Sequence, residues 1–454
     1  MKKIKGLLLV AILFCIKQAN AQIITTVAGG GAQGFSGDGG AATAAELYLP
    51  TKVNFDLAGN MYIADFSNNR IRKVTASGII TTIAGNGSRT YSGDGVQATA
   101  AALNDPSAVA VDAVGNVYIA DASNNRIRMV NTSGMISTFA GNGTLSFSGD
   151  GGQATAAGLS YPTGLAFDAQ NNLFVADKEN NRIRKITPSG IITTFAGSSF
   201  SQGPGGDGGQ ATAANFAGPD DIAFDAAGNL YIADPGNMKV RMINTAGIIN
   251  TVAGNGYGAG SPFGGFSGDG GQATAAKLNS PEGVALDAAG NLYIADFMNN
   301  RIRMVTPSGI ISTVAGDASS GYNGDGIQAT SANLSTPWGV AIDALGNIFI
   351  ADQGNNRIRM VTNNTAGINQ LLTNREEIVI YPNPAKDIIR IEFKSQNEVQ
   401  NVSIRIMDIL GKVLKQLSTS SNLLSVNIDD LNEGVYMLEI INGNQKVIKR
   451  LIKQ

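Results

Sequence analysis

The sequence predicts an all-β fold made of six similar units. A phrase of the form Ile-Ala-Asp, followed closely by Asn-Asn-Arg, returns in six copies at nearly even spacing, with its alanines at Ala64, Ala120, Ala176, Ala233, Ala295 and Ala351. The third copy begins with Val175, and the fourth has Asn237-Met238-Lys239 in place of Asn-Asn-Arg. Short apolar segments around each phrase alternate with turn residues, as the strands of a meander do. One four-stranded sheet exposes two edges, whereas six sheets arranged radially hide most of theirs. The repeats therefore predict a six-bladed β-propeller.

Each unit contains four predicted strands. In the second unit they are Ala108 to Asp112, Val117 to Ala120, Arg126 to Val130 and Met135 to Ala140. Glycine, asparagine and serine, which favour tight turns, separate these segments. Strand direction places the turn after the second strand and the longer loop to the next unit on one face. Long loops on one side of a rigid scaffold are where binding is usually found.

The two ends of the repeat array predict how the ring closes. The segment Ile23 to Ala28 matches the fourth strand of the other units but has no unit before it. We expect it to pair with the third strand of the last unit, which satisfies backbone groups worth about 1 kcal/mol per hydrogen bond. The alternative is that Ile368 to Leu372 closes its own unit.

Residues 1–21 have the pattern of a signal peptide. Basic Lys2, Lys3 and Lys5 precede an apolar run that ends near Ile16, and Ala19-Asn20-Ala21 is a small-x-small cleavage signal. The apolar run is too short to span a bilayer. We expect cleavage after Ala21, export, and no transmembrane segment in the mature chain. Its remaining sequence has neither cysteine nor histidine, which excludes disulfides and removes the commonest zinc ligand and general base.

Charge argues against nucleic acid as a partner. Loss of the four lysines in the signal peptide takes the formal net charge from −2 to about −6. Phosphate binding needs a positive surface. The arginines and lysines also recur evenly rather than in one cluster, so we expect them on a solvated face.

A second domain is predicted over residues 375–454. Glycine becomes rare there, the repeat stops, and segments such as Ile388 to Phe393, Val402 to Met407 and Gly434 to Ile441 have the apolar pattern of strands. A small Ig-like β-sandwich is the expected fold. The predicted organisation is a signal peptide at 1–21, a propeller at 22–374 and this domain at 375–454.

Two families can be recognised in these patterns. The run Pro281-x-Gly283-Val284-Ala285, Gly290 to Asp296 and Asn299 to Arg303 resembles bacterial NHL repeats, six times in register. The resemblance implies a six-bladed propeller that binds proteins, nucleic acid or glycans, with a minority of enzymes.

The last eighty or so residues resemble the type-A sorting domain of type IX secretion cargo. The motifs are Tyr381-Pro382-Asn383-Pro384, Asp408 to Lys412 and Gly434-Val435-Tyr436. The resemblance implies contact with the type IX secretion machinery, passage across the outer membrane, and release or surface attachment once the tail is removed.

Two recurring motifs carry aspartate. The first set begins tight turns, where an Asp side chain accepts backbone N–H groups, so we interpret it as structural rather than metal-binding: Asp65, Asp121, Asp177, Asp234, Asp296 and Asp352. The arginine that follows each turn can bridge neighbouring turns.

The second set lies in Gly-Asp-Gly loops, each followed by an Ala-rich run that predicts one helical turn. Its members are weak candidates for calcium, because hard cations prefer carboxylate and carbonyl oxygens: Asp38, Asp94, Asp150, Asp207, Asp269 and Asp325. No metal or other cofactor is assigned.

Residues that differ between units are better candidates for a binding site than shared ones. After the proline that opens each innermost strand, the six units have Thr51, Ser107, Thr163, Asp220, Glu282 and Trp338, and Asp221 follows Asp220. We expect these side chains at the mouth of the central channel. A tryptophan beside carboxylates suits a polyhydroxylated or cationic ligand. Alternatively, Trp338 fills the channel and the acids are solvated.

We therefore expect an exported, non-catalytic protein whose long-loop face binds an extracellular protein or glycan. One alternative is a calcium-dependent, lactonase-like hydrolase or lyase. No nucleophile and base pair stands out for it, so no catalytic residue is assigned. A further alternative is a structural adhesin or spacer.

Overall fold

The structure is a computed structural model that describes residues 22–198, 205–261, 263–362, 378–393, 402–408, 413–442 and 445–453. Two compact units are present, one of Gln22–Asn363 and one that includes Asn364–Gln454. The predicted signal peptide and the predicted boundary at residues 374 and 375 lie outside the described residues. Within the described ranges, no helix has the length and apolar character needed to cross a membrane.

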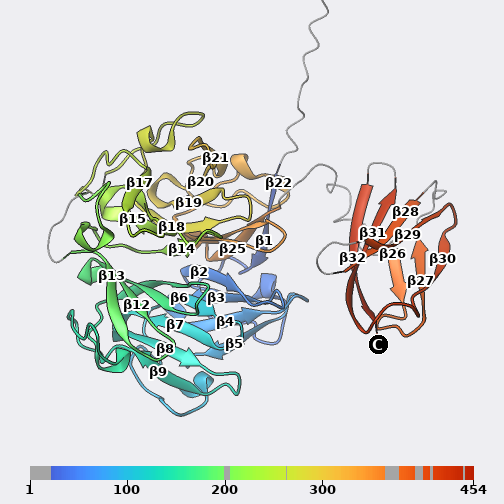
Figure 1. Ribbon diagram of the computed structural model, residues 1–454, viewed down its shortest axis with the longest axis horizontal. Coiled ribbons are helices and arrows are strands. Elements are labelled where there is room, and N and C mark those ends of the chain that lie inside the picture. Colours follow the sequence, from blue (N-terminus) through green and yellow to red (C-terminus); the bar gives the residue numbers. More distant parts are fainter. Residues whose placement is uncertain are drawn as a thin grey trace, which may run out of the picture. The chain divides into compact units, whose positions relative to one another are not determined.

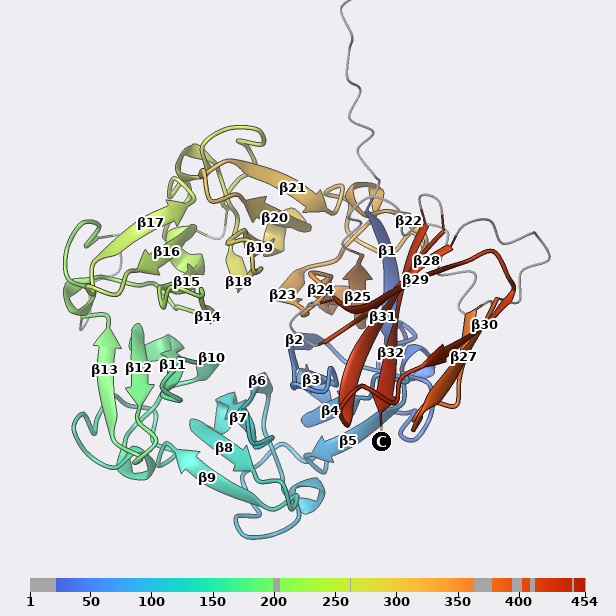
Figure 2. The same cartoon turned by 45° about the vertical axis from the view of Figure 1, so that its right-hand side comes forward.

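The first unit is a ring of six antiparallel sheets, which confirms the predicted propeller (Figures 1 and 2). From the centre outward, blade one has β2 (Pro50–Phe55), β3 (Met61–Asp65), β4 (Arg70–Val74) and β5 (Ile80–Ala84). Blade two has β6 (Pro106–Val111), β7 (Val117–Asp121), β8 (Arg126–Val130) and β9 (Ile136–Ala140). Blade three has β10 (Pro162–Phe167), β11 (Leu173–Asp177), β12 (Arg182–Ile186) and β13 (Ile192–Ala196).

The other three blades repeat this order. Blade four has β14 (Ile222–Phe224), β15 (Leu230–Asp234), β16 (Lys239–Ile243) and β17 (Ile249–Ala253). Blade five has β18 (Pro281–Leu286), β19 (Leu292–Asp296), β20 (Arg301–Val305) and β21 (Ile311–Ala315). Blade six has β23 (Pro337–Ile342), β24 (Ile348–Asp352) and β25 (Arg357–Val361), and its fourth strand comes from the start of the chain.

That fourth strand is β1 (Ile23–Ala28), which confirms the predicted closure of the ring. It pairs antiparallel with β25, with Ile24 opposite Val361 and Thr25 opposite Met360. On its other side it pairs with the short β22 (Ile327–Gln328). The alternative closing segment, residues 368–372, lies outside the described residues.

Two kinds of 3-10 helix recur. The predicted Ala-rich helical turns are confirmed at η1 (Ala42–Ala44), η3 (Ala98–Ala100), η5 (Ala154–Ala156), η7 (Ala211–Ala213), η9 (Ala273–Ala275) and η11 (Ala329–Ser331). The others follow the second strand of each blade: η2 (Phe66–Asn68), η4 (Ala122–Asn124), η6 (Lys178–Asn180), η8 (Pro235–Asn237), η10 (Phe297–Asn299) and η12 (Gln353–Asn355). The residue after η2 is Asn69, with a φ of 53°, and asparagine adopts this left-handed conformation more readily than most residues.

The Gly-Asp-Gly loops cover the outer edge of each blade. In blade one, the Gly39 N–H donates to the carbonyl of Ile80 at 2.8 Å, and the Ile80 N–H donates to Gly40 at 3.0 Å. An uncovered outer strand would offer unpaired backbone groups to other chains. The long loops therefore protect the blades as well as linking them.

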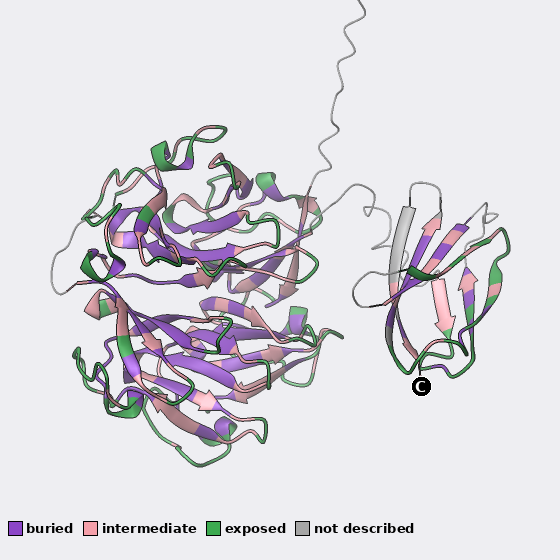
Figure 3. Cartoon of the chain, in the orientation of Figure 1, coloured by how far each residue is buried: buried purple, intermediate pink, exposed green. Residues whose placement is uncertain are grey.

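Apolar side chains are buried between neighbouring blades. One such cluster joins Tyr62 and Ala64 of blade one to Val109 and Ile119 of blade two. The loops at the ends of the strands carry much of the exposed surface (Figure 3). The core therefore holds the innermost strands in fixed positions around the channel.

The second unit is a small sandwich of two antiparallel sheets. One sheet has the order β26 (Ile378–Tyr381), β27 (Ile388–Phe393), β30 (Leu423–Asn427). The other has the order β29 (Val413–Thr419), β28 (Val402–Met407), β31 (Gly434–Asn442), β32 (Gln445–Lys453). Its core combines Ile391 and Val426 of the first sheet with Ile404, Leu438 and Leu451 of the second. A C-terminal β-sandwich was predicted and is confirmed.

Candidate functional site at the channel mouth and the long-loop face

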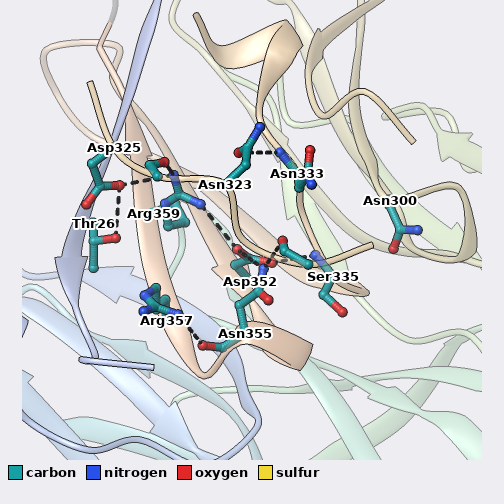
Figure 4. Close-up of polar contacts among 12 residues, drawn as sticks. Thr26, Asn300, Asn323, Asp325, Asn333, Ser335, Asp352, Asn355, Arg357 and Arg359 are labelled. Atoms are coloured by element: carbon teal, nitrogen blue, oxygen red, sulfur yellow. Dashed lines mark hydrogen bonds and ion pairs between the residues drawn. The ribbon is translucent and has the colours of Figure 1, made fainter. Parts of the chain in front are cut away.

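A buried arginine holds the long-loop side of each blade together. In blade six, Arg359 donates to Asp325 Oδ1 at 3.0 Å and to the carbonyl of Gly324 at 2.8 Å (Figure 4). Its Nη1 lies 3.5 Å from Asp352 Oδ2 (Figure 4). We call this arrangement, one arginine between a loop Asp and a turn Asp, the arginine clamp. The equivalent arginines of the other blades are equally buried: Arg72, Arg128, Arg184, Arg241 and Arg303.

The clamp corrects one expectation from the sequence. These six arginines were expected on a solvated face, yet none has any exposed surface. Burying a guanidinium is tolerable only when carboxylates and carbonyls satisfy its charge and its donors. The Asp of the Gly-Asp-Gly loop and the Asp of the turn neutralise the charge in every blade. The Nε of each of these arginines has no hydrogen-bond partner among the described residues.

The aspartates of the Ile-Ala-Asp phrase are structural, as interpreted from the sequence. Asp352 accepts the N–H of Ser335 at 2.7 Å and the side-chain amide of Asn355 at 2.8 Å (Figure 4). Burial raises its pKa to about 6, although these donors and Arg359 oppose the shift. The same backbone and amide bonds recur at the other five aspartates.

The first arginine of the motif bridges turns, which was also predicted. Arg70 donates to the carbonyl of Asn68 at 2.8 Å and to that of Asn86, in the next loop, at 3.0 Å. Asn68 in turn donates to the carbonyl of Gly34 at 2.6 Å. The turn and the interblade loops therefore lie on one face, as strand direction required.

The loop aspartates that were weak calcium candidates are partners of the clamp. Asp38 lies 2.8 Å from Arg72, and the distances in the other five blades are between 2.6 and 3.0 Å. Within the described parts of the chain, no three or more Asp, Glu, Cys or His side chains gather as they would to bind a metal ion. Calcium at these loops stays a prediction.

Hydroxyls at the channel mouth link one blade to the next. Thr51 donates to the carbonyl of Ser107 at 2.8 Å, Ser107 to that of Pro162 at 3.1 Å, and Thr163 to that of Asp220 at 2.8 Å. All three side chains are buried. They therefore contribute to the ring itself rather than to an open surface.

Glycine lets the innermost strands approach closely at the same level. A Cβ on Gly339 would lie 2.3 Å from the carbonyl oxygen of Thr51, and one on Gly283 would lie 2.5 Å from that of Trp338. Gly164 is equally close to the carbonyl of Asp220. No side chain fits at these three positions, so the ring is tight here.

The two aspartates of blade four are buried and paired with lysines of other blades. Asp220 accepts Lys178 Nζ at 2.9 Å and the indole N–H of Trp338 at 2.9 Å. Asp221 accepts Lys52 Nζ, and also the N–H of Val284 at 2.9 Å. Both aspartates are only 3% exposed, so the alternative in which the acids are solvated is wrong. Although burial lowers the pKa of Lys178, the carboxylates of Asp220 and Glu282 raise it.

Glu282 is the incompletely paired member of the cluster. It is 6% exposed, and its Oε1 accepts the hydroxyl of Ser280 at 2.8 Å. Its Oε2 has no hydrogen-bond partner among the described residues and lies 3.9 Å from Lys178 Nζ. Burial, together with the charge of Asp220, raises the pKa of Glu282 to about 8.

Little space remains between these groups. The cavity is lined by Lys52, Ser107, Ala108, Thr163, Asp220, Asp221, Glu282, Trp338 and Gly339. It offers about 10 Å³ to the centre of a water molecule, which is enough for about one water. Trp338 packs edge-on against Phe297, with ring centroids 5.2 Å apart. The structure thus brings six of the seven predicted residues together around this cavity, as a polar knot in which most groups have internal partners. The seventh, Thr51, does not line the cavity but bonds to the carbonyl of Ser107.

Sequence reasoning missed Lys52 and Lys178. Both were detectable by the rule that singled out the acids, because both are specific to one blade. Where blade one has Lys52, blade two has Ala108, and where blade three has Lys178, blade two has Ala122. A pair of blade-specific lysines was the signal that the blade-specific acids have partners inside the ring.

Comparison with family models supports both units. The Teneurin NHL domain model matches residues 18–92, 88–148, 145–204, 198–265 and 262–322, and the NHL repeat model matches 334–359. The secretion system C-terminal sorting domain model matches residues 379–454.

Curated relatives share part of the chain. Teneurin-4 of Mus musculus is 32% identical over 291 residues, which cover 57% of this chain and 10% of the teneurin. Protein SUPPRESSOR OF QUENCHING 1, chloroplastic, of Arabidopsis thaliana is 29% identical over 314 residues, which cover 67% of this chain and 29% of that protein. The chain therefore spans only a small part of these relatives.

Solved structures share the fold. A protein of unknown function from Bacteroides thetaiotaomicron aligns with a TM-score of 0.53 and 18% identity, over 75% of this chain and 76% of that one. An auxiliary nutrient binding protein from Bacteroides ovatus aligns with a TM-score of 0.55 and 15% identity, over the same shares. At these identities the likeness shows the fold alone. With its family match over most of the propeller, the chain belongs to the NHL-repeat β-propeller family and carries the C-terminal sorting domain of type IX secretion cargo.

Proposed function

We propose that this exported protein is a non-catalytic binding protein whose partner, an extracellular glycan or protein, docks on the long-loop face of the propeller. The observation that carries the proposal is the arginine clamp. Six clamps fix six long loops on one side of a rigid ring. Because these loops are already ordered, binding of a partner to this face costs little loop conformational entropy.

The channel mouth is a less open part of this face. A sugar ring needs far more room than the roughly one water that the polar knot admits. Ligand contact by the buried Asp220 or Glu282 would therefore require the knot to separate, whereas Trp338 is partly exposed. That these residues bind a ligand stays a prediction, and the Trp338→Ala variant tests it.

Relatives of the same fold are compatible with a binding role. Two solved neighbours from Bacteroides species carry the description auxiliary nutrient binding protein. Their ligands are not transferred to this chain, because sequence identity is 16% or less. They support the proposal only by showing that propellers of this kind include binding proteins.

The test is binding of the full chain, purified from the secreted fraction, to arrays of glycans and of cell-surface peptides, with calcium and with a chelator. We expect saturable binding without turnover. Loss of that binding in Trp338→Ala, with unchanged melting temperature, would place the contact at the channel mouth. Absence of binding on both arrays would overturn the proposal in favour of a structural spacer. Turnover of lactones that chelation abolishes would overturn it in favour of the enzyme alternative.

A further inference from the structure

Five aromatic rings are exposed on the long-loop face, one in each of five blades. Each stands three residues before the Asp of a Gly-Asp-Gly loop, and the five are Phe35, Tyr91, Phe147, Phe266 and Tyr322. Their exposed fractions lie between 38% and 40%. In blade four the sequence has Pro204 at this position. We call these five side chains the aromatic rim.

A cation fixes each ring of the aromatic rim. The guanidinium carbon of Arg70 lies 3.6 Å from the ring centroid of Phe35, and the equivalent distances in the other four blades are 3.7 to 3.9 Å. Arg70 is itself held by the carbonyls of Asn68 and Asn86. The clamp arginine of the same blade also lies near each ring, 4.6 to 4.9 Å from its centroid. Two arginines thus hold the ring in place, and its exposed part is a rigid platform that loses little conformational entropy when a ligand binds.

A carboxylate accompanies each ring at a fixed place. The side chains of the five loop aspartates in these blades are 37% to 41% exposed, and the clamp arginine holds one oxygen of each. In blade two, the hydroxyl of Tyr91 lies 2.9 Å from Asp94 Oδ2. Each of these five blades thus repeats a flat apolar surface beside a partly exposed carboxylate.

This pairing fits sugars better than an apolar protein segment. The C–H faces of a sugar ring stack on aromatic rings, and its hydroxyls donate to carboxylates. An apolar protein partner would instead need a continuous apolar patch, whereas the rim separates its rings by polar and charged loops. Repetition at the spacing of the blades also suits a ligand with repeating units, because weak contacts add when they are linked.

We propose that the aromatic rim is a set of stacking platforms for the sugar rings of a neutral polymeric glycan, one platform in each of the five blades. The proposal rests on the proposed function, that the long-loop face binds a partner, and names the class of partner and the residues that contact it.

The test compares rim variants of the full chain for binding to xylan, mannan, pullulan and galactan. Leucine replaces the ring in each variant, because it still covers the arginine but lacks a flat face. A single change such as Phe147→Leu should weaken binding to the best polymer about threefold to tenfold. All five changes together should weaken it more than 100-fold. Tyr91→Phe and Tyr322→Phe, which keep the ring, should bind within about twofold of the parent.

Matched controls lie on the opposite face. Leu57, Val114 and Leu345 are 75% to 90% exposed at the turns after the first strands, and their alanine variants should bind like the parent. Circular dichroism and melting temperature establish that each variant is folded. If the fivefold leucine variant is destabilised, the single variants and the two Phe variants decide the question.

The outcomes separate this inference from the proposed function. If a polymer binds equally well to the parent and to the folded fivefold variant, the platforms are wrong while binding by the protein stands. If none of the four polymers binds but surface peptides do, the glycan inference is overturned and the binding function survives. If neither binds, both are overturned.

Discussion

At the scale of single residues, the molecule depends on charges that are buried and neutralised. The arginine clamp places one guanidinium between two carboxylates, and the polar knot at the channel mouth pairs two aspartates with two lysines. Such pairs are costly to break, because removal of one partner leaves the other charge buried without compensation. Substitution of a clamp residue should therefore lower the free energy of unfolding more than substitution of a more exposed neighbour.

Arg128→Ala and Arg126→Ala form a matched pair in one strand. Arg128 is fully buried against Asp121, so its loss should destabilise the protein by about 3–5 kcal/mol. Arg126 is partly exposed and bonds to the carbonyls of Asn124 and Asn142, so its loss should cost about 1–2 kcal/mol. Urea unfolding measures both. Equal losses of stability would contradict the clamp.

Glu282 should make stability depend on pH. Its folded-state pKa of about 8 lies above the ordinary value of 4.5, so the folded protein keeps a proton that the unfolded chain releases between these values. Binding of this proton therefore contributes fully to the free energy of unfolding below pH 4.5, and this contribution is lost as the pH rises through 8. Glu282→Gln, which mimics the protonated form, should match the parent at pH 5. At pH 9 it should be more stable by roughly 2 kcal/mol or more.

Unfolding measured from pH 5 to pH 9 checks this prediction, with the exposed Glu179→Gln as control. The control should follow the parent at every pH. If the difference in stability between the parent and Glu282→Gln stays constant from pH 6 to pH 9, Glu282 ionises as an ordinary carboxylate.

Sequence reasoning found the role of some residues and missed that of others for physical reasons. Asp65 stands in a turn, and the preference of aspartate for turn N–H groups is local, so its role was predictable. Arg72 is buried because a loop some thirty residues earlier brings Asp38 to it, and no local pattern reports such a contact. Asp220 and Lys178 also meet only through the ring, although each is specific to its blade.

At the scale of elements, the innermost strands are packed as closely as their backbones allow. The positions of Gly164, Gly283 and Gly339 face the carbonyls of neighbouring blades, and blade two has the small Ala108 at the same place. The strands themselves were predicted to within about two residues in the second blade, because their apolar pattern and turns are regular. Their close approach was not predicted, since it depends on how tightly six blades close.

Gly339→Ala tests that approach. The new Cβ would meet the carbonyl of Thr51 at 2.3 Å, so the first and last blades must move apart, and we expect a loss of about 1–3 kcal/mol. Ala108→Gly, at the equivalent place in blade two, is the control and should cost about 1 kcal/mol or less. Thermal unfolding compares the two. If Gly339→Ala proved the milder change, the ring would be looser than its geometry indicates.

At the scale of the whole molecule, a propeller is joined to a domain that directs secretion. The fold of both units was predictable, because repeats in register and a run of sorting motifs are strong signals. The partner was not predictable to the same degree. Shared residues report the scaffold, whereas the few blade-specific ones turned out to pair largely with one another.

Removal of residues 379–454 should abolish export across the outer membrane. The sorting domain carries the signal, whereas the propeller has its own core and ring closure. The shortened chain should therefore accumulate in the periplasm, which fractionation and immunoblotting can follow beside the full chain and a periplasmic marker. Appearance of the shortened chain at the cell surface or in the medium would refute the sorting role.

The closing strand also sets an order of events during folding. The hydroxyl of Thr362 lies 3.4 Å from the carbonyl of Ile23, a contact between residues 339 positions apart in the chain. Contacts of such long range form late, because the entropy of closing so large a loop must be met first. Blades one to five can assemble from segments that are neighbours in the sequence, whereas blade six needs strands from both ends of the propeller sequence. The propeller therefore remains an open arc until β25, at the far end of its sequence, is available to pair with the first strand.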